Sequence, residues 1–164
     1  MSERESRTSG PDTGTETGAR RGRSEKAEAR VRESFGRQGL MGLLGARIVE
    51  VGHGTCEIEL SFRDEITQQR YFHGAVAGAI GDSAGGYAAL TMAPPDREVL
   101  TVEYKVNFLA PAQGEKLVAR GKVLTAGRRL FVCRAEVVAV SAGGEETPCA
   151  AIQQTVATTP VQAP

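Results

Sequence analysis

Apolar and polar residues alternate along much of the chain, and this alternation predicts six β-strands. Within residues 55–62 every second side chain is apolar, which is the pattern of a strand with one buried face. Residues 45–51 form a run just before it, and the turn between the two runs predicts a β-hairpin with His53 at its exposed tip. The remaining predicted strands cover residues 101–108, 117–124, 130–140 and 149–158. Short connections between them favour an antiparallel sheet.

Residues 72–90 predict one long helix between the second and third strands, although the segment contains several glycines. Each glycine disfavours a helix by about 1 kcal/mol relative to alanine, so something else must favour them. At 100° per residue, Asp82 falls on a stripe of small residues with Gly78, Gly85 and Ala89. Such a stripe lets a ligand or a second backbone approach closely, so Asp82 is a candidate reacting group rather than a solvated charge. One long central helix and six strands predict an α+β domain whose antiparallel sheet wraps around the helix.

Composition divides the chain into three segments. Residues 1–24 contain almost no apolar side chains and predict a disordered tail. The basic run at residues 20–23 could contact a polyanion, although a solubilising tail is the simpler interpretation. Residues 25–37 carry apolar side chains every four positions and predict a short amphipathic helix. Residues 38–160 contain the predicted strands and long helix, and form the folded domain.

Charge and cysteine content exclude several classes of protein. The 20 basic and 20 acidic residues cancel, so no net field favours nucleic acid or an anionic membrane. Cys56, Cys133 and Cys149 lack metal-ligand spacing, and the chain has only two histidines, which argues against a disulfide framework and a zinc site. We therefore expect buried free thiols in a cytoplasmic protein, with no metal and no cofactor. The N-terminus has no apolar signal-peptide core, and the charge of Asp82 argues against membrane insertion of the long helix.

Three features in order identify a family resemblance. His73 and Gly74 open the predicted helix, Asp82 lies nine residues after His73, and the strand at residues 101–108 runs on through an F-L-A-P-A-x-G motif that ends at Gly114. Over roughly residues 38–158, this combination resembles the hotdog-fold acyl-CoA thioesterases of the phenylacetate-pathway (PaaI-like) type. The resemblance implies a hotdog fold and hydrolysis of an acyl-CoA to a free acid and CoA.

The same resemblance implies roles for four residues. Asp82 would attack the thioester directly or deprotonate the attacking water, at a site shared between two protomers. The backbone amide of Gly74 would donate to the oxyanion, and His73 would act through its backbone and the shape of the turn, or through its ring. Thr101 would orient the acid or the water. From the sequence alone, Asp82 could instead make a structural hydrogen bond, and Thr101 could be an ordinary strand residue.

The sequence departs from the family pattern just before the helix. The usual amide side chain six residues before His73 is replaced by Thr67, and Gln68 takes its role only if the loop is one residue shorter. Ala75 stands where the family usually has a second glycine, which could tighten the oxyanion turn.

Phosphates of CoA need basic partners. The turn formed by Gly127, Arg128 and Arg129 suits this role and resembles the place where family members meet the nucleotide, although a solvated turn would look the same. Asn107 and Lys105 lie on the polar face of their predicted strand and are further binding candidates.

These observations favour a homodimeric or homotetrameric acyl-CoA thioesterase. A non-catalytic acyl-CoA sensor on the same fold is the alternative, although the segment before the domain is too short for a DNA-binding module. A hydratase would use a histidine and acid pair, for which only His53 and His73 are available. The sequence does not specify the acyl group.

Overall fold

The computed structural model describes residues 13–161. Its helices are α1 (Thr13–Gly36), α2 (Gly39–Leu44), the short 3-10 helix η1 (Asp64–Ile66) and α3 (Gly74–Leu90). Its strands are β1 (Arg47–Gly52), β2 (Thr55–Ser61), β3 (Thr67–Gln68), β4 (Tyr71–Phe72), β5 (Arg97–Phe108), β6 (Lys116–Ala126), β7 (Leu130–Val140) and β8 (Glu146–Pro160). The loop predicted at residues 63–72 thus contains η1 and a small β3–β4 hairpin.

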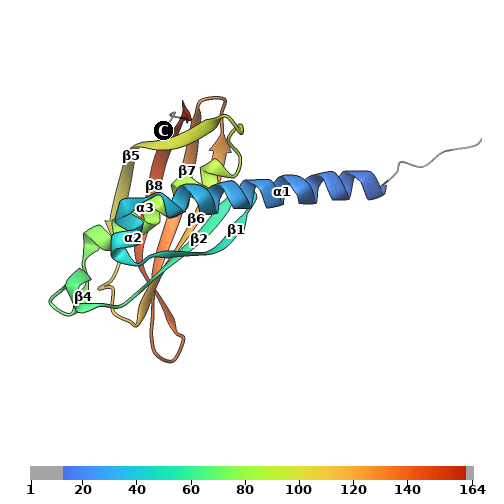
Figure 1. The fold of residues 1–164 in the computed structure, drawn as a ribbon. Coiled ribbons are helices and arrows are strands. Elements are labelled where there is room, and N and C mark those ends of the chain that lie inside the picture. Colours follow the sequence, from blue (N-terminus) through green and yellow to red (C-terminus); the bar gives the residue numbers. More distant parts are fainter. Residues whose placement is uncertain (1–12, 162–164) are drawn as a thin grey trace, which may run out of the picture.

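Six strands form one antiparallel sheet that curves around α3 (Figure 1). The strand order is β1-β2-β6-β7-β8-β5, and every neighbouring pair is antiparallel. The predicted α+β fold, with a six-stranded antiparallel sheet around one long helix, is confirmed. This order leaves β1 and β5 as the two edge strands.

The small residues of α3 and β6 allow the helix to lie very close to its own sheet. A Cβ atom at Gly81 would collide with Ile152, and one at Gly85 would collide with the side-chain amide of Gln154. A Cβ at Gly121 of β6 would collide with the α3 backbone at Ala84. The expectation that the helix glycines leave room for a ligand is therefore wrong for Gly81 and Gly85, because the sheet fills that space.

Two other glycines of α3 do lie on an open side. At Gly86 a Cβ would meet nothing within 4 Å, and at Gly78 its nearest neighbour would be the Tyr104 hydroxyl at 3.6 Å. These two positions, and Asp82 between them, face the region beside β5.

A β-bulge in β5 changes which side chains face α3. Thr101 pairs with Val156, but the next pairs are Glu103 with Thr155 and Tyr104 with Gln154, so the register shifts by one residue at Val102. Strict alternation through residues 101–108 would put the side chains of Thr101 and Tyr104 on opposite faces of the strand. This expectation is wrong, because the extra residue of the bulge puts both side chains on the face toward α3.

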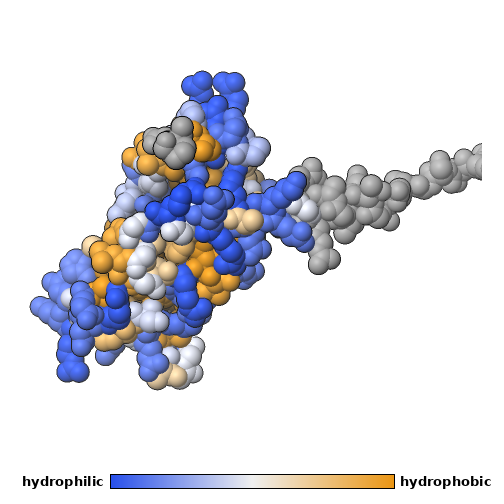
Figure 2. All heavy atoms as spheres, viewed as in Figure 1, coloured by the Kyte–Doolittle hydropathy of each residue, from blue (hydrophilic) through white to orange (hydrophobic). Residues whose placement is uncertain are grey.

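The α3-facing and neighbouring positions of β5 expose apolar side chains. Leu100, Val102, Tyr104 and Phe108 are between 44% and 65% exposed. Figure 2 shows the resulting apolar surface over β5. An exposed apolar edge strand is an unpaired surface that proteins normally cover.

Helix α1 is longer than the sequence predicts. It begins at Thr13, so residues 13–24, expected to be disordered, form its first turns and extend beyond the sheet (Figure 1). This segment contains three glycines and three threonines, which disfavour helix, so its helical state depends on propagation from the α1 residues that follow it. The rest of the predicted tail, residues 1–12, lies outside the described residues.

The three cysteines agree with a further expectation. Cys56, Cys133 and Cys149 are buried and free, as predicted, and burial raises the pKa of Cys56 to about 12. Among the described residues, no helix has the length and apolar character needed to cross a membrane.

Candidate active site

Asp82 lies in the middle of α3 and is held by two side chains from the sheet. The Thr101 hydroxyl donates to Asp82 Oδ1 at 2.7 Å. The Gln154 Nε2 group donates to the same Oδ1 at 3.1 Å and to the Asp82 backbone oxygen at 3.0 Å. Within the described part of the chain, Oδ2 accepts no hydrogen bond, so one oxygen fixes the carboxylate and the other is free to react.

The surroundings of Asp82 favour a basic carboxylate. Burial raises the pKa of Asp82, and the hydrogen bonds from Thr101 and Gln154 act in the opposite direction. A carboxylate with a raised pKa accepts a proton more readily than an exposed aspartate does. The arrangement suits a general base or a nucleophile.

Gln154 is a site residue that the sequence analysis missed. It lies on β8, is 1% exposed, and occupies a position between Ile152 and Val156 that alternation assigns to the buried face. A glutamine at such a position was the available signal, because a buried amide requires polar partners. Its partner is Asp82, and Gly85 supplies the space for its side chain.

The N-terminus of α3 carries one free backbone donor. His73 is the N-cap, and its Nδ1 accepts a hydrogen bond from the Ala75 amide at 3.0 Å. The His73 ring therefore shapes the turn. Among the described residues, the Gly74 amide has no hydrogen-bond partner, and it lies at the positive end of the helix.

Gly74 is tightly covered by an aromatic side chain of β5. A Cβ at this position would lie 2.9 Å from Phe108 Cζ, so the glycine allows the strand and the helix terminus to approach. Phe108 marks one end of β5 and Thr101 lies seven residues away.

Gly74 and Asp82 are separated within one chain. They are eight residues apart on α3, and a rise of 1.5 Å per residue puts their backbones about 12 Å apart. One thioester carbon cannot lie beside both groups. A single chain therefore does not bring these two groups together.

The structure places Gln68, the predicted amide side chain, at the surface before α3. Gln68 is exposed on β3 and pairs with Tyr71, across a turn in which Gln69 and Arg70 have positive φ angles of 53° and 69°. The Thr67 hydroxyl donates to the Asp64 backbone oxygen at 2.8 Å and so closes η1. Gln68 and Thr67 lie before α3, far from the groove beside Asp82.

The predicted CoA-binding residues lie at the surface in two places. Gly127, Arg128 and Arg129 form the exposed β6–β7 turn, which is tied to the end of β8 by a bond from the Thr158 amide to the Arg129 oxygen at 2.9 Å. Asn107 is also exposed, but on the face of β5 away from α3, since its neighbour Phe108 faces the helix. The same side of the strand holds Lys105.

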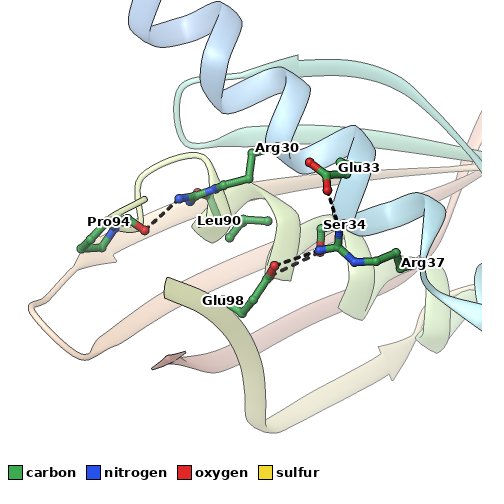
Figure 3. Close-up of polar contacts among 7 residues, drawn as sticks. All are labelled: Arg30, Glu33, Ser34, Arg37, Leu90, Pro94 and Glu98. Carbon is green, nitrogen blue, oxygen red and sulfur yellow. Dashed lines mark hydrogen bonds and ion pairs between the residues drawn. The ribbon is translucent and has the colours of Figure 1, made fainter. Parts of the chain in front are cut away.

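A groove of about 1210 Å³ begins at Asp82 and Thr101. It runs along α3, between α1 and the first half of β5, and reaches the end of β8. Figure 3 shows the polar side chains of α1 and β5 that border it. The reactive carboxylate therefore opens onto a cavity large enough for part of a substrate.

Comparison with known proteins assigns this chain to a family. Residues 69–144 match the family model described as Thioesterase superfamily. The solved structure of a thioesterase family protein from Silicibacter pomeroyi is 38% identical, with a TM-score of 0.80, over 82% of this chain and 99% of that chain.

Two more distant structures share the fold. The E. coli PaaI protein from the phenylacetic acid degradation operon has a TM-score of 0.72 and 17% identity, over 85% of this chain and 96% of that chain. A thioesterase from Haemophilus influenzae has a TM-score of 0.69 and 18% identity, over 81% of this chain and 90% of that chain. The chain belongs to the thioesterase superfamily and has the hotdog fold.

Proposed function

We propose that the protein hydrolyses acyl-CoA thioesters, with Asp82 as the nucleophile or general base and the Gly74 amide as the oxyanion donor. The observation that carries the proposal is the state of Asp82. Two donors hold Oδ1, no described residue donates to Oδ2, and the residue lines an open groove. Membership of the thioesterase superfamily supports the reaction class.

Two routes are consistent with this geometry. In the first, Asp82 Oδ2 removes a proton from water as the oxygen attacks the thioester carbonyl, and the tetrahedral oxyanion accepts a hydrogen bond from the Gly74 amide. Collapse of the intermediate expels the CoA thiolate, which takes the proton back from Asp82. In the second, the carboxylate itself attacks, giving an anhydride and CoA, and water then hydrolyses the anhydride.

A second copy of the chain would complete the site. Two residues of edge strand β5 lie beside the candidate groups. Thr101, in the first half of the strand, contacts Asp82, and Phe108, at its last position, covers Gly74. Antiparallel pairing of two β5 strands about a two-fold axis near Tyr104 would exchange these ends and cover the exposed apolar side chains. Gly74 of one protomer would then lie beside Asp82 of the other, so we propose a homodimer or a higher homo-oligomer built on it.

The β6–β7 turn is a reasonable contact for the CoA phosphates. Arg128 and Arg129 are exposed, and the turn is bonded to the end of β8, whose residues Thr159 and Pro160 line the groove. Guanidinium groups bind phosphate oxygens through paired hydrogen bonds. Replacing both arginines with serine is expected to raise KM for acyl-CoA without lowering kcat.

The proposed function is tested by release of free thiol from a panel of acyl-CoAs. We expect turnover by the wild type and its loss in Asp82→Asn, which keeps the shape and the Oδ1 acceptor. Tight binding of acyl-CoA by the wild type without thiol release would instead support a non-catalytic sensor. Unchanged turnover in Asp82→Asn would show that another group performs the chemistry.

A further inference from the structure

Helix α1 forms one wall of the groove that leads away from Asp82. Its residues Arg30, Ser34, Arg37 and Gln38 line the cavity, opposite the β5 residues that precede Thr101. The thioester chemistry proposed above uses none of these α1 side chains. Their place in the same cavity as Asp82 calls for a separate role.

The wall is firmly attached to the end of α3. The Arg30 guanidinium donates to the backbone oxygens of Pro94 at 2.8 Å and Ala93 at 3.0 Å, and also to that of Leu90 (Figure 3). These carbonyls belong to the end of α3 and to the turn that follows it, so Arg30 ties α1 to this turn. Val31 of α1 is completely buried beside this anchor.

Glu98 of β5 ties the opposite side of the groove to α1. It accepts a hydrogen bond from the Ser34 hydroxyl at 3.3 Å and forms an ion pair with Arg37 at 3.2 Å (Figure 3). Arg37 is also paired with Glu33 at 2.9 Å. Arg37, Glu33 and Glu98 are therefore paired with one another, and the Arg30 guanidinium is occupied by backbone oxygens, which leaves little free charge in this wall to select an ionic ligand.

The character of the groove changes along its length. Next to Asp82 it is bordered by Val99 and Leu100 and by Gly86, where no atom lies within 4 Å of a Cβ position. At α1 it reaches Tyr87, which lines the groove together with Ser34 and Gln38. The Tyr87 ring packs on Phe35 of α1 with ring centroids 5.6 Å apart, which holds this polar end in place.

We propose that α1 is the specificity wall of the acyl-binding site, in which Ser34 and Gln38, with Tyr87, select short acyl groups that end in a hydroxyl or another neutral hydrogen-bonding group. This inference rests on the proposed thioester hydrolysis and deepens it. Tyr87 lies five residues beyond Asp82, or about 7.5 Å along α3, which sets the length of a short acyl group. A plain alkyl end would displace water from these polar groups without replacing its hydrogen bonds, and is disfavoured.

Two matched substrates, hexanoyl-CoA and 6-hydroxyhexanoyl-CoA, test the inference. We expect the wild type to favour the hydroxylated thioester by about tenfold in kcat/KM, the effect of one or two neutral hydrogen bonds. The double variant Ser34→Ala with Gln38→Leu should reduce this ratio to about one. Arg32→Gln is the matched control, since Arg32 is an exposed α1 residue outside the groove whose pair with Glu28 stabilises little.

Binding measurements separate this inference from the proposed reaction. The dissociation constants of both thioesters with Asp82→Asn, measured by calorimetry, should show the same preference, and the preference should disappear when Ser34 and Gln38 are also replaced. Hydrolysis of both substrates at equal rates, with equal binding, would overturn the inference and leave the thioesterase function standing. Preferential binding without any thiol release by the wild type would overturn the function and support the binding site. Tyr87→Phe is a further variant, which keeps the ring packing and removes only the hydroxyl. If both this variant and the double variant keep the preference for the hydroxylated thioester, the inference is also overturned.

Discussion

Replacing Gln154 with leucine separates catalysis from stability at this site. The substitution keeps the size of a buried side chain but removes the Nε2 donor to Asp82 Oδ1 and to the Asp82 backbone oxygen. A hydrogen bond to a charged group is worth about 1.5–3 kcal/mol, so the loss of carboxylate positioning corresponds to roughly a tenfold to hundredfold decrease in kcat/KM.

The free energy of unfolding should change far less than the activity. In the native protein, Gln154 Oε1 is buried without a hydrogen-bond partner, which disfavours the folded state by about 1–3 kcal/mol. Leucine removes this unsatisfied atom, and the gain offsets most of the lost bond to Asp82. We therefore expect a melting temperature close to that of the wild type together with a large loss of turnover.

The pH profile provides a second, independent measurement. The bond from Gln154 favours the charged form of Asp82, so its removal should raise the pKa of the carboxyl further. The acid limb of kcat/KM should move to higher pH in Gln154→Leu. Gln153→Leu is the matched control, because Gln153 is the adjacent, exposed residue of β8 and should affect neither quantity.

Two results would refute this reasoning. If Gln154→Leu keeps the turnover of the wild type and the acid limb of its kcat/KM profile does not move, Gln154 does not position Asp82. A decrease in turnover matched by a collapse of the melting temperature would show that Gln154 acts through packing alone.

The structure supports three further predictions. Thr101→Val should lower kcat/KM by about tenfold with little loss of stability, because it removes the 2.7 Å bond to Asp82 Oδ1 and keeps the shape; equal rates in a thiol-release assay would contradict it. Gly85→Ala should destabilise the fold by roughly 1–3 kcal/mol in urea denaturation, because its methyl group collides with Gln154. Gly86→Ala should stabilise the fold by about 0.5–1 kcal/mol, because its methyl group meets no atom and alanine favours helix. The reverse order of stabilities would exclude the packing described for α3. Asp82→Asn should raise the melting temperature at neutral pH. Burial raises the pKa of Asp82 in the folded protein, so ionisation of this carboxyl disfavours the folded state as pH rises through the folded pKa. The gain in melting temperature should vanish below the unfolded pKa of about 3.9.

Local patterns in the sequence were sufficient for the long elements of the domain, but not for α2, η1 or the β3–β4 hairpin. Strands and the central helix are long and strongly patterned, and Asp82 stands out because a lone acid on a stripe of small residues is unusual. Thr101 was also identified, but with the wrong orientation. The bulge at Val102 depends on pairing between β5 and β8, and no periodicity within one strand reveals it.

Long-range packing explains the features that the sequence did not reveal. Gly81 and Gly85 are matched to Ile152 and Gln154, which lie about 70 residues later and meet them only when the sheet closes around α3. The groove beside α1 likewise depends on the contacts of Arg30 with Pro94 and of Arg37 with Glu98. The sequence suggested an amphipathic helix there but gave no reason to place it beside Asp82.

Complementation between two inactive variants tests most directly whether the site is shared between protomers. Asp82→Asn removes the reactive carboxylate, and Gly74→Pro removes the amide donor at the first position of α3, where proline is compatible with a helix. Because a Cβ at this position would lie 2.9 Å from Phe108 Cζ, dimer formation by Gly74→Pro is measured by size-exclusion chromatography before the mixture is assayed. In a mixed dimer, one site then contains the intact Gly74 of one chain and the intact Asp82 of the other, while the second site contains both substitutions.

Thiol release from the two variants, refolded separately and together, gives the decisive comparison. Each variant alone is predicted to be inactive, and the mixed dimer is predicted to recover up to about half of the wild-type turnover, since one of its two sites is intact. A mixture that forms mixed dimers and yet stays inactive would contradict the shared site, because it would mean that Gly74 and Asp82 must come from the same chain.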